Sequence, residues 1–566
     1  MADRRGGERV VVLELELRAC CRGAWQYRFC EKTALRERFC ANEIDFWQNA
    51  RMDNPADAVG GAWLARQFGL DLVMPLATIS NIGRRRSSHI EDGQTRETFV
   101  ESMRPDDSLR GHLTFHLKRE APHLELLSRL FSACDGADLV AWFNDEPTGQ
   151  YVRRACFLYE WLTGRQLSVA PSVPVGYVDV LDADLVVAAS PAKAVPNRRW
   201  RVRDNMPGTP AFCPIVRKTP QMLQSMNLDV AALLADLGRE FGEDLLMKSA
   251  VWMTMRESRS SFAIEGEADK ADRIQRFAGV LGRRTGQGEL PLTETALAEL
   301  QSEILGAVTS LRQFGLRSSP VFVGEAHGYQ EVVHYIAPPA QDLRTMLEGI
   351  AAFIDRTHGQ SPIMRSAVAA FGFVYIHPLA DGNGRVHRFL INDLLRRDGA
   401  VRDPIIVPVS SLITSDGAER RAYDRILEVI SRPLMTSLAG QYGFGERVTY
   451  ADGITSNLSF TGDESARHVW RQMDLSRHVM YLSGVVQRTI AEDMREESRY
   501  LRRHAQSRAA IKDIIEMPDA QIDRVIRSIE ANKGALTNVL AKEIPALARD
   551  GVWEAIVAAL NSPAAT

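Results

Sequence analysis

A stretch of twelve residues, 377–388, combines side chains that could bind a phosphate chain and move a proton; it reads HPLADGNGRVHR. Gly382 and Gly384 allow consecutive backbone N–H groups to converge on an anion without interference from a Cβ atom. Arg385 and Arg388 are three residues apart, so on a helix both lie on one face and can reach the same phosphate chain. His377 can accept a proton near neutral pH.

Asp381 stands beside this basic cluster, where an uncompensated carboxylate would repel phosphate. A Mg²⁺ ion that bridges Asp381 and the phosphate oxygens would remove the conflict, and Mn²⁺ could substitute for it. Taken singly, a histidine is usually a plain hydrogen-bonding residue and Gly-Asn-Gly is commonly a turn. Their combination in this order and spacing predicts a phosphate-binding active site.

The flanking residues predict two helices that would position this loop. Residues 364–376 are apolar at helical spacing, and Pro378 prevents a smooth continuation of that helix. A second amphipathic helix is expected to begin near Gly384 or Arg385 and to stop at Gly399. Its free N–H groups and the positive end of its dipole would then point at the bound anion.

The stretch 377–388 resembles the HPFx(D/E)GNGRxxR signature of Fic-domain proteins, with Leu379 where phenylalanine is usual. The resemblance implies a mainly α fold. A Fic-type helical core with a β-hairpin flap would be flanked by a mixed or irregular N-terminal region and a C-terminal helical bundle. It also implies that His377 is the catalytic base and that Asp381 is the metal ligand.

A second match lies upstream, where residues 261–266 (SFAIEG) resemble the (S/T)xxxE(G/N) inhibitory motif of the family. The motif precedes the core on the same chain, which is the class II arrangement. The resemblance implies an inhibitory role for Ser261, Glu265 and Gly266. Glu265 can pair with Arg388 and occupy the guanidinium that would hold the nucleotide γ-phosphate.

Two β-rich runs, 321–323 and 332–336, flank Gly324 and Gly328 and predict a hairpin over 321–336. With Pro338-Pro339 following, the hairpin resembles the Fic flap. In the family, this flap holds the backbone of the target as an added edge strand and presents a hydroxyl to the histidine. The residues that would dock the target are Val332, Val333, His334 and Tyr335.

The resemblance implies protein AMPylation, in which AMP passes from ATP to a Ser, Thr or Tyr hydroxyl of a target protein or of the enzyme itself. Such a nucleotidyltransferase would have ATP and a target protein as partners, and a homodimer is possible. The nucleotide-binding residues would be Gly382, Asn383, Gly384, Arg385, Arg388 and, at the adenine, Tyr423.

Three alternatives stay open on the sequence. The same residues could remove AMP from a modified protein, with Glu265 aligning a water, or could transfer UMP, phosphate or phosphocholine. The retained Gly-Asn-Gly disfavours phosphate transfer. From another class, a nucleic-acid-binding regulator could use the arginines and tryptophan of 198–203 and the C-terminal helices. The intact His377, Asp381 and Arg388 argue against that class.

Composition favours a soluble protein of several domains, and we expect a cytoplasmic one. The 566 residues are 45% hydrophobic and 25% charged, with 69 basic and 72 acidic residues and a net charge of −3. This balance creates no overall attraction to nucleic acid. No stretch approaches the roughly 18 apolar residues of a membrane span. The seven cysteines include no CxxC pair, which argues against a zinc site.

The predicted organisation has five parts. The expected boundaries are an extension (1–25), an N-terminal Fic-associated region (26–220) with a proline-rich connector (171–220), a linking helix (221–249), the Fic domain (250–436) and a C-terminal helical domain (437–566). Within the N-terminal region, residues 123–164 have helical periodicity, with Leu124, Leu127, Leu130 and Phe131 on one stripe.

Overall fold

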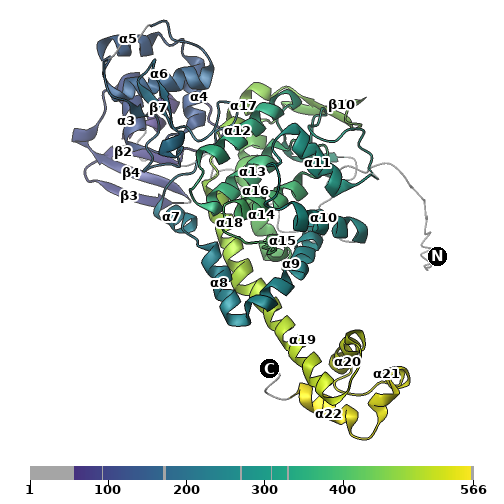
Figure 1. Ribbon diagram of the computed structural model, residues 1–566. Coiled ribbons are helices and arrows are strands. Elements are labelled where there is room, and N and C mark those ends of the chain that lie inside the picture. Colours follow the sequence, from purple (N-terminus) through teal and green to yellow (C-terminus); the bar gives the residue numbers. More distant parts are fainter. Residues whose placement is uncertain are drawn as a thin grey trace, which may run out of the picture.

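The computed structural model describes residues 57–91, 93–169, 174–267, 270–307, 309–327 and 330–561. The predicted extension 1–25 therefore lies outside the described residues, as do Cys20, Cys21, Cys30 and Cys40. Helices predominate, which confirms the predicted fold class. Figure 1 shows an N-terminal part, a large central body and a small helical bundle at the end of a long helix.

The N-terminal part combines a sheet with a group of helices. Its strands lie in the order β1-β2-β4-β3. Leu124, Leu127, Leu130 and Phe131 are at most 2% exposed, so the predicted helical stripe faces the core. The elements are β1 (Ala58–Val59), α2 (Gly61–Gln67), β2 (Thr78–Gly83), β3 (Ser87–Glu91), β4 (Gln94–Val100), α3 (Leu109–Arg119), α4 (Leu124–Ala133), α5 (Ala137–Asp145) and α6 (Gln150–Thr163).

The described part of the proline-rich connector joins two hydrophobic cores. It forms a small sheet in the order β5-β7-β6, from Val178–Asp179, Val202–Asp204 and Val195–Asn197. Trp200 belongs to the N-terminal core, whereas Phe212 belongs to the central one. A Cβ atom on Gly349 would lie 2.6 Å from the Cβ atom of Phe212, so the connector needs a glycine there to approach the central body.

The basic and aromatic run 198–203 is part of this packing and is not an open platform for nucleotide bases. Trp200 is 0% exposed, and its indole N–H donates a 2.7 Å hydrogen bond to Glu160. Arg199 pairs with the same carboxylate at 3.0 Å, and Arg203 pairs with Asp179. These contacts contradict the use of Trp200 for base stacking, on which the nucleic-acid alternative partly depended.

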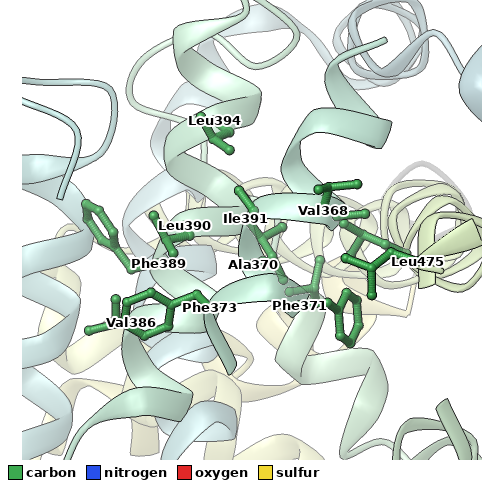
Figure 2. Close-up of a cluster of buried hydrophobic side chains, with 14 of the residues drawn as sticks. Val368, Ala370, Phe371, Phe373, Val386, Phe389, Leu390, Ile391, Leu394 and Leu475 are labelled. Atoms are coloured by element: carbon green, nitrogen blue, oxygen red, sulfur yellow. The ribbon is translucent and has the colours of Figure 1, made fainter. Parts of the chain in front are cut away.

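The central body is built on two adjacent helices, α13 (Pro362–Ile376) and α14 (Asn383–Arg397), which pack against each other. Figure 2 shows the apolar side chains that they share, among them Phe371, Phe373, Phe389 and Leu390. All four are at most 2% exposed. Burial of large apolar side chains stabilises a fold by roughly 1.5–3 kcal/mol each, so this contact holds both ends of the intervening loop.

Around this pair lie α7 (Pro220–Met226), α8 (Val230–Phe241), α9 (Glu243–Ile264), α10 (Ala271–Arg284), α11 (Glu294–Leu305), the hairpin β8 (Phe322–His327) and β9 (Gln330–Ile336), α12 (Leu343–Arg356), α15 (Val409–Ile413) and α16 (Gly417–Ser437).

The single linking helix predicted over 221–249 is wrong. Asp229 caps α8 by accepting a hydrogen bond from Ala232, and Gly242, with φ 92°, separates α8 from α9.

The segment after residue 437 differs from the predicted helical domain. It begins with a β-hairpin, β10 (Tyr442–Thr449) and β11 (Thr455–Phe460), and then forms α17 (Asp463–Arg471), α18 (Ser476–Arg488) and a π-helical turn (Thr489–Met494). Apolar residues of α17, α18 and the turn belong to the core of the central body. Tyr442, Phe444 and Val448 alternate along β10, but two glycines and two charged residues stand among them, and such residues are depleted in strands.

Within the described residues after 437, the last four helices form a bundle whose core is separate from that of the central body. They are α19 (Arg495–Ile514), α20 (Asp519–Ala531), α21 (Asn538–Glu543) and α22 (Val552–Leu560). Figure 1 shows that α19 continues the line of α18 away from the central body. Across the part of the chain that the structure describes, no helix has the length and apolar character needed to span a bilayer.

We predict that Trp200→Ala lowers the free energy of unfolding by about 3–5 kcal/mol, because it leaves a large cavity in the N-terminal core. Chemical denaturation followed by circular dichroism would measure the change. Val195→Ala in the same connector is the control, since Val195 is 51% exposed and its loss should cost less than about 0.5 kcal/mol. Equal stability of the two variants would contradict the packing described here.

Candidate active site

The loop between α13 and α14 is held in one shape by its own side chains. His377 ends α13 in the left-handed conformation, with φ 51° and ψ 55°, and Gly382 precedes α14 with φ 95°. The side-chain amide of Asn383 accepts a hydrogen bond from the N–H of Leu379 and donates one to its carbonyl, at 2.9 and 2.7 Å. Leu379 is 0% exposed, so the residue that departs from the family pattern still anchors the loop in the core.

The start of α14 provides backbone donors for an anion. The helix begins at Asn383, one residue before the predicted start. The N–H groups of its first turn have no acceptor within the helix, and the helix dipole is positive at this end. Asn383, Gly384, Arg385 and Arg388 are all buried in this turn and the next, which brings the predicted phosphate-binding residues together.

His377 has the geometry of a neutral imidazole with one free acceptor nitrogen. It is 5% exposed, and its Nδ1 lies 3.1 Å from the carbonyl oxygen of Val374. That oxygen can only accept, so Nδ1 carries the proton and Nε2 keeps its lone pair. Burial, reinforced by the positive charge of Arg317, lowers the pKa of His377 to about 4. The ring is therefore neutral at pH 7 and able to receive a proton.

The two arginines share one buried carboxylate. Arg388 donates hydrogen bonds of 2.7 Å to Oε1 of Glu265 and to the hydroxyl of Ser261. The other oxygen of Glu265 lies 3.0 Å from Nε of Arg385. Glu265 is 8% exposed and the two arginines 3% and 1%, so the ionic cluster is shielded from water. The predicted pairing of Glu265 with Arg388 is present, and Glu265 contacts Arg385 as well.

The arginines retain unused hydrogen-bonding capacity. Nη1 of Arg388 and Nη1 of Arg385 are buried, and neither has a hydrogen-bond acceptor among the described residues. An unsatisfied buried donor costs about 1–3 kcal/mol, more when it is charged. Oxygen atoms of a polyphosphate are the acceptors that such donors prefer. The residues present therefore fit a nucleotide phosphate chain.

Glu265 is carried by α9, and a second buried carboxyl fixes this helix to the central body. Glu257, Ser261 and Glu265 are spaced by four residues and so lie on one face of α9. Glu257 is 0% exposed and accepts hydrogen bonds from the N–H and hydroxyl of Ser410 on α15, at 2.8 and 2.6 Å. Burial raises the pKa of Glu257 to about 7, although both bonds from Ser410 oppose the shift.

Asp381 lies at the edge of the phosphate-binding residues. Its side chain is 43% exposed and accepts a 2.8 Å hydrogen bond from Arg385. Its backbone carbonyl accepts one from the side chain of Gln301. In the described chain no three His, Cys, Asp or Glu side chains form a metal cluster. Mg²⁺ is commonly bound by one or two carboxylates together with substrate phosphates, so Asp381 beside this anion site fits that use.

The hairpin β8–β9 forms as predicted, with Glu325 opposite Val332 and Ala326 opposite Glu331. Along β9, Val332 and His334 are exposed, whereas Tyr335 is 5% exposed and its hydroxyl donates to the carbonyl of Tyr375. Tyr335 therefore anchors the hairpin to α13 through its side chain. Target docking by Val332, Val333, His334 and Tyr335 stays a prediction.

Tyr423 of α16 is 3% exposed, and its ring lies 6.4 Å from the rings of both His387 and Tyr481. It packs behind the arginine cluster among other aromatic side chains. Its predicted contact with adenine stays a prediction.

Comparisons with known proteins agree with this geometry. Residues 291–395 match the Fic/DOC family model. A stretch of 122 residues is 31% identical to "Protein adenylyltransferase Fic" of Drosophila virilis and 30% identical to that of Drosophila melanogaster, which is 21% of this chain and 23% of each relative. The chain thus matches less than a quarter of these relatives' length. The residues that match this family model include the loop 377–388 and most of its two helices, which agrees with the resemblance that the loop motif predicted.

Among solved structures, a Fic family protein from Desulfovibrio desulfuricans G20 is similar to this chain with a TM-score of 0.36 and 19% identity. That similarity covers 53% of this chain and 82% of the other. The motif 261–266 lies outside the matched residues 291–395, so its inhibitory role rests on the contacts described above and remains a prediction.

We predict that the imidazole of His377 stays neutral down to about pH 5, because its pKa is lowered to about 4. NMR of ¹³C-labelled histidine, assigned with His377→Gln, would measure the titration. The unfolded chain binds a proton at an ordinary pKa near 6.5. His377 therefore contributes stability above about pH 6.5 that is lost as the pH falls towards 4. A midpoint near 6.5 in the folded protein would contradict the prediction.

Proposed function

We propose that the chain is a protein AMPylase, which transfers AMP from ATP to a hydroxyl of a target protein and is held inactive by Glu265. The observation that carries the proposal is the loop 377–388, where a neutral histidine stands at the end of one helix and two buried arginines stand at the start of the next. The similar Drosophila proteins are named protein adenylyltransferases, which supports the reaction class.

In the proposed reaction, Nε2 of His377 accepts the proton of the incoming hydroxyl. The hydroxyl oxygen forms a bond to the α-phosphorus of ATP, and the bond from that phosphorus to the bridging oxygen breaks, so pyrophosphate leaves. The lowered pKa keeps His377 in the form that can accept the proton across the physiological pH range. Val374 holds the ring in the required tautomer.

The nucleotide would be held by the first turn of α14. N–H groups at Asn383 and Gly384 would face the α-phosphate oxygens as negative charge develops there. Arg385 and Arg388 would hold the β- and γ-phosphates through their unused Nη1 donors and, once Glu265 has left, through Nη2 of Arg388 as well. A Mg²⁺ ion, held by Asp381 and the phosphates, would neutralise charge on the leaving group when bound.

Inhibition follows from competition for the same guanidiniums. Glu265 and a γ-phosphate are both anions, and both would need Nη2 of Arg388, which is hydrogen-bonded to Glu265 at 2.7 Å. While Glu265 holds Arg388, the triphosphate cannot take up the pose in which the α-phosphorus faces His377. Removing this carboxylate leaves the catalytic loop intact, because the loop is closed by Asn383 and not by α9.

We predict that Glu265→Gly increases self-labelling by ATP carrying ³²P on its α-phosphate. Hydrogen bonds to charged groups contribute about 1.5–3 kcal/mol, which corresponds to an increase of roughly 10- to 100-fold. Adding His377→Ala should abolish the signal. Autoradiography and mass spectrometry would identify the transferred group and its acceptors.

Glu267→Gly is the matched control, because Glu267 lies 3.8 Å from Arg385 and its side chain is 32% exposed. We expect little change from that variant. Label from the γ-phosphate would indicate phosphate transfer instead. Absence of label from Glu265→Gly with Mg²⁺ or Mn²⁺ would refute AMP transfer, and release of AMP from a modified partner by the unmutated protein would favour the reverse reaction.

A further inference from the structure

A buried arginine outside the loop 377–388 touches the backbone of the candidate base. Arg317 lies between α11 and β8 and is 2% exposed. Its Nε donates to the carbonyl of His377 at 2.7 Å, and its own backbone N–H donates to the carbonyl of Pro378 at 2.9 Å. These bonds hold the two peptide groups that follow the histidine, at the point where the backbone has a positive φ.

The same guanidinium reaches the end of the flap. Nη2 donates to the carbonyl of Pro338 at 2.6 Å, and Nη1 donates to the carbonyl of Ser319 at 2.8 Å. Pro338 follows β9 by two residues, so Arg317 contacts both the base loop and the segment directly after the strand expected to hold the target. Only arginine has a planar group with donors in these three directions, and a lysine could not satisfy all three carbonyls in the same geometry.

Arg317 is itself held in place from the other hairpin. One carboxylate oxygen of Asp452, in the turn between β10 and β11, accepts hydrogen bonds from the N–H groups of Ser318 and Ser319 and from the Ser319 hydroxyl, at 2.9, 2.9 and 2.7 Å. Asp452 is 2% exposed. No carboxylate forms an ion pair with Arg317 within the described residues, so three carbonyl dipoles stabilise its buried charge.

From these contacts we infer that Arg317 is a positioning residue, which sets the separation and angle between His377 and the flap. A hydroxyl docked on the flap would reach Nε2 of His377 only if the loop and β9 keep their relative place. Arg317 bonds to the loop and to Pro338, which follows β9 by two residues. The inference rests on the proposed AMP transfer. It assigns to Arg317 no contact with ATP, because each of its three guanidinium nitrogens already donates to a backbone carbonyl, of His377, Ser319 or Pro338.

The charge of Arg317 affects the pKa of His377, which can be measured without any enzymatic activity. After burial, this charge is the main cause of the lowered pKa of His377, and the Val374 carbonyl acts in the opposite direction. Removing the charge should therefore raise that pKa, whereas a purely structural arginine elsewhere should leave it unchanged. The NMR titration of His377 measures this even if no AMP transfer occurs.

The test compares Arg317→Met and Arg317→Lys in the full chain carrying Glu265→Gly. For Arg317→Met we expect the His377 pKa to rise by about one unit or more, towards its ordinary value. We also expect kcat for AMP transfer to fall roughly 100-fold, because small misplacements of a reacting group have effects of this size. The KM for ATP should stay within about twofold, since the phosphate-binding arginines are untouched.

Arg365→Met is the matched control. Arg365 is also 2% exposed and also hydrogen-bonded at each terminal nitrogen, but its partners are Asp398, Ile354 and Thr357. It should lower stability without changing the His377 pKa. An unchanged His377 pKa together with an unchanged kcat in Arg317→Met would overturn the inference.

If Arg317→Met does not fold, Arg317→Lys decides the question. The lysine keeps the charge but not the three-way geometry, so we expect a His377 pKa near 4 and a kcat at least tenfold lower. An undiminished kcat in Arg317→Lys would overturn the positioning role. If the Glu265→Gly parent transfers no AMP, the proposed function fails, and the pKa comparison still shows whether Arg317 acts on His377.

Discussion

The positive charge of Arg385 and Arg388 is the constraint on which the rest of the molecule depends. Two guanidiniums, nearly removed from water, must be neutralised by an anion, because an unpaired buried charge costs several kcal/mol. In this structure Glu265 approaches from α9 and contacts both, and Asp381 pairs with Arg385 as well. For a nucleotide to bind, its phosphates must replace the carboxylate of Glu265. The resting state therefore has Glu265 at the two arginines, and the reactive state has the nucleotide there.

The flanking parts of the chain bear on this choice because they contact α9. Arg256 of α9 lies 3.3 Å from Glu497 and 3.5 Å from Asp493, beside the start of the long helix that leads to the C-terminal bundle. The connector packs Phe212 against α12 and α13, the latter being the helix that ends at His377. Two-thirds of the chain lies outside the predicted Fic domain 250–436, and these contacts join parts of it to the elements that carry the base and the inhibiting carboxylate.

The structure could be predicted best where one short segment contains both the reactive side chains and the residues that determine its backbone conformation. The loop 377–388, its two helices and the pairing of Glu265 with Arg388 could be predicted because glycine, proline and apolar spacing act locally. Arg317 could not be found in this way. Its partners are backbone carbonyls of His377, Ser319 and Pro338, and a carbonyl is present at every position, so no pattern of side chains indicates the contact. The hairpin β10–β11 was missed for a different reason, because the alternation of Tyr442, Phe444 and Val448 is weakened by glycines and charged residues, which are depleted in strands.

The spacing of three side chains on α9 limits how the inhibiting carboxylate can leave. Glu257 is bonded to Ser410 two turns before Glu265, so sliding or tilting the whole helix would break the hydrogen bonds of a second buried carboxyl. Unwinding only the end of α9 would leave the hydrogen bonds of Glu257 in place. That end is followed by Gly266, which has φ 72°. Release of Glu265 therefore needs the opening of about two helical turns, a local event with a smaller free-energy cost than movement of the domain. The inhibitory segment is thus the end of a helix that is fixed at Glu257, and its length is limited to the seven residues between Glu257 and Glu265.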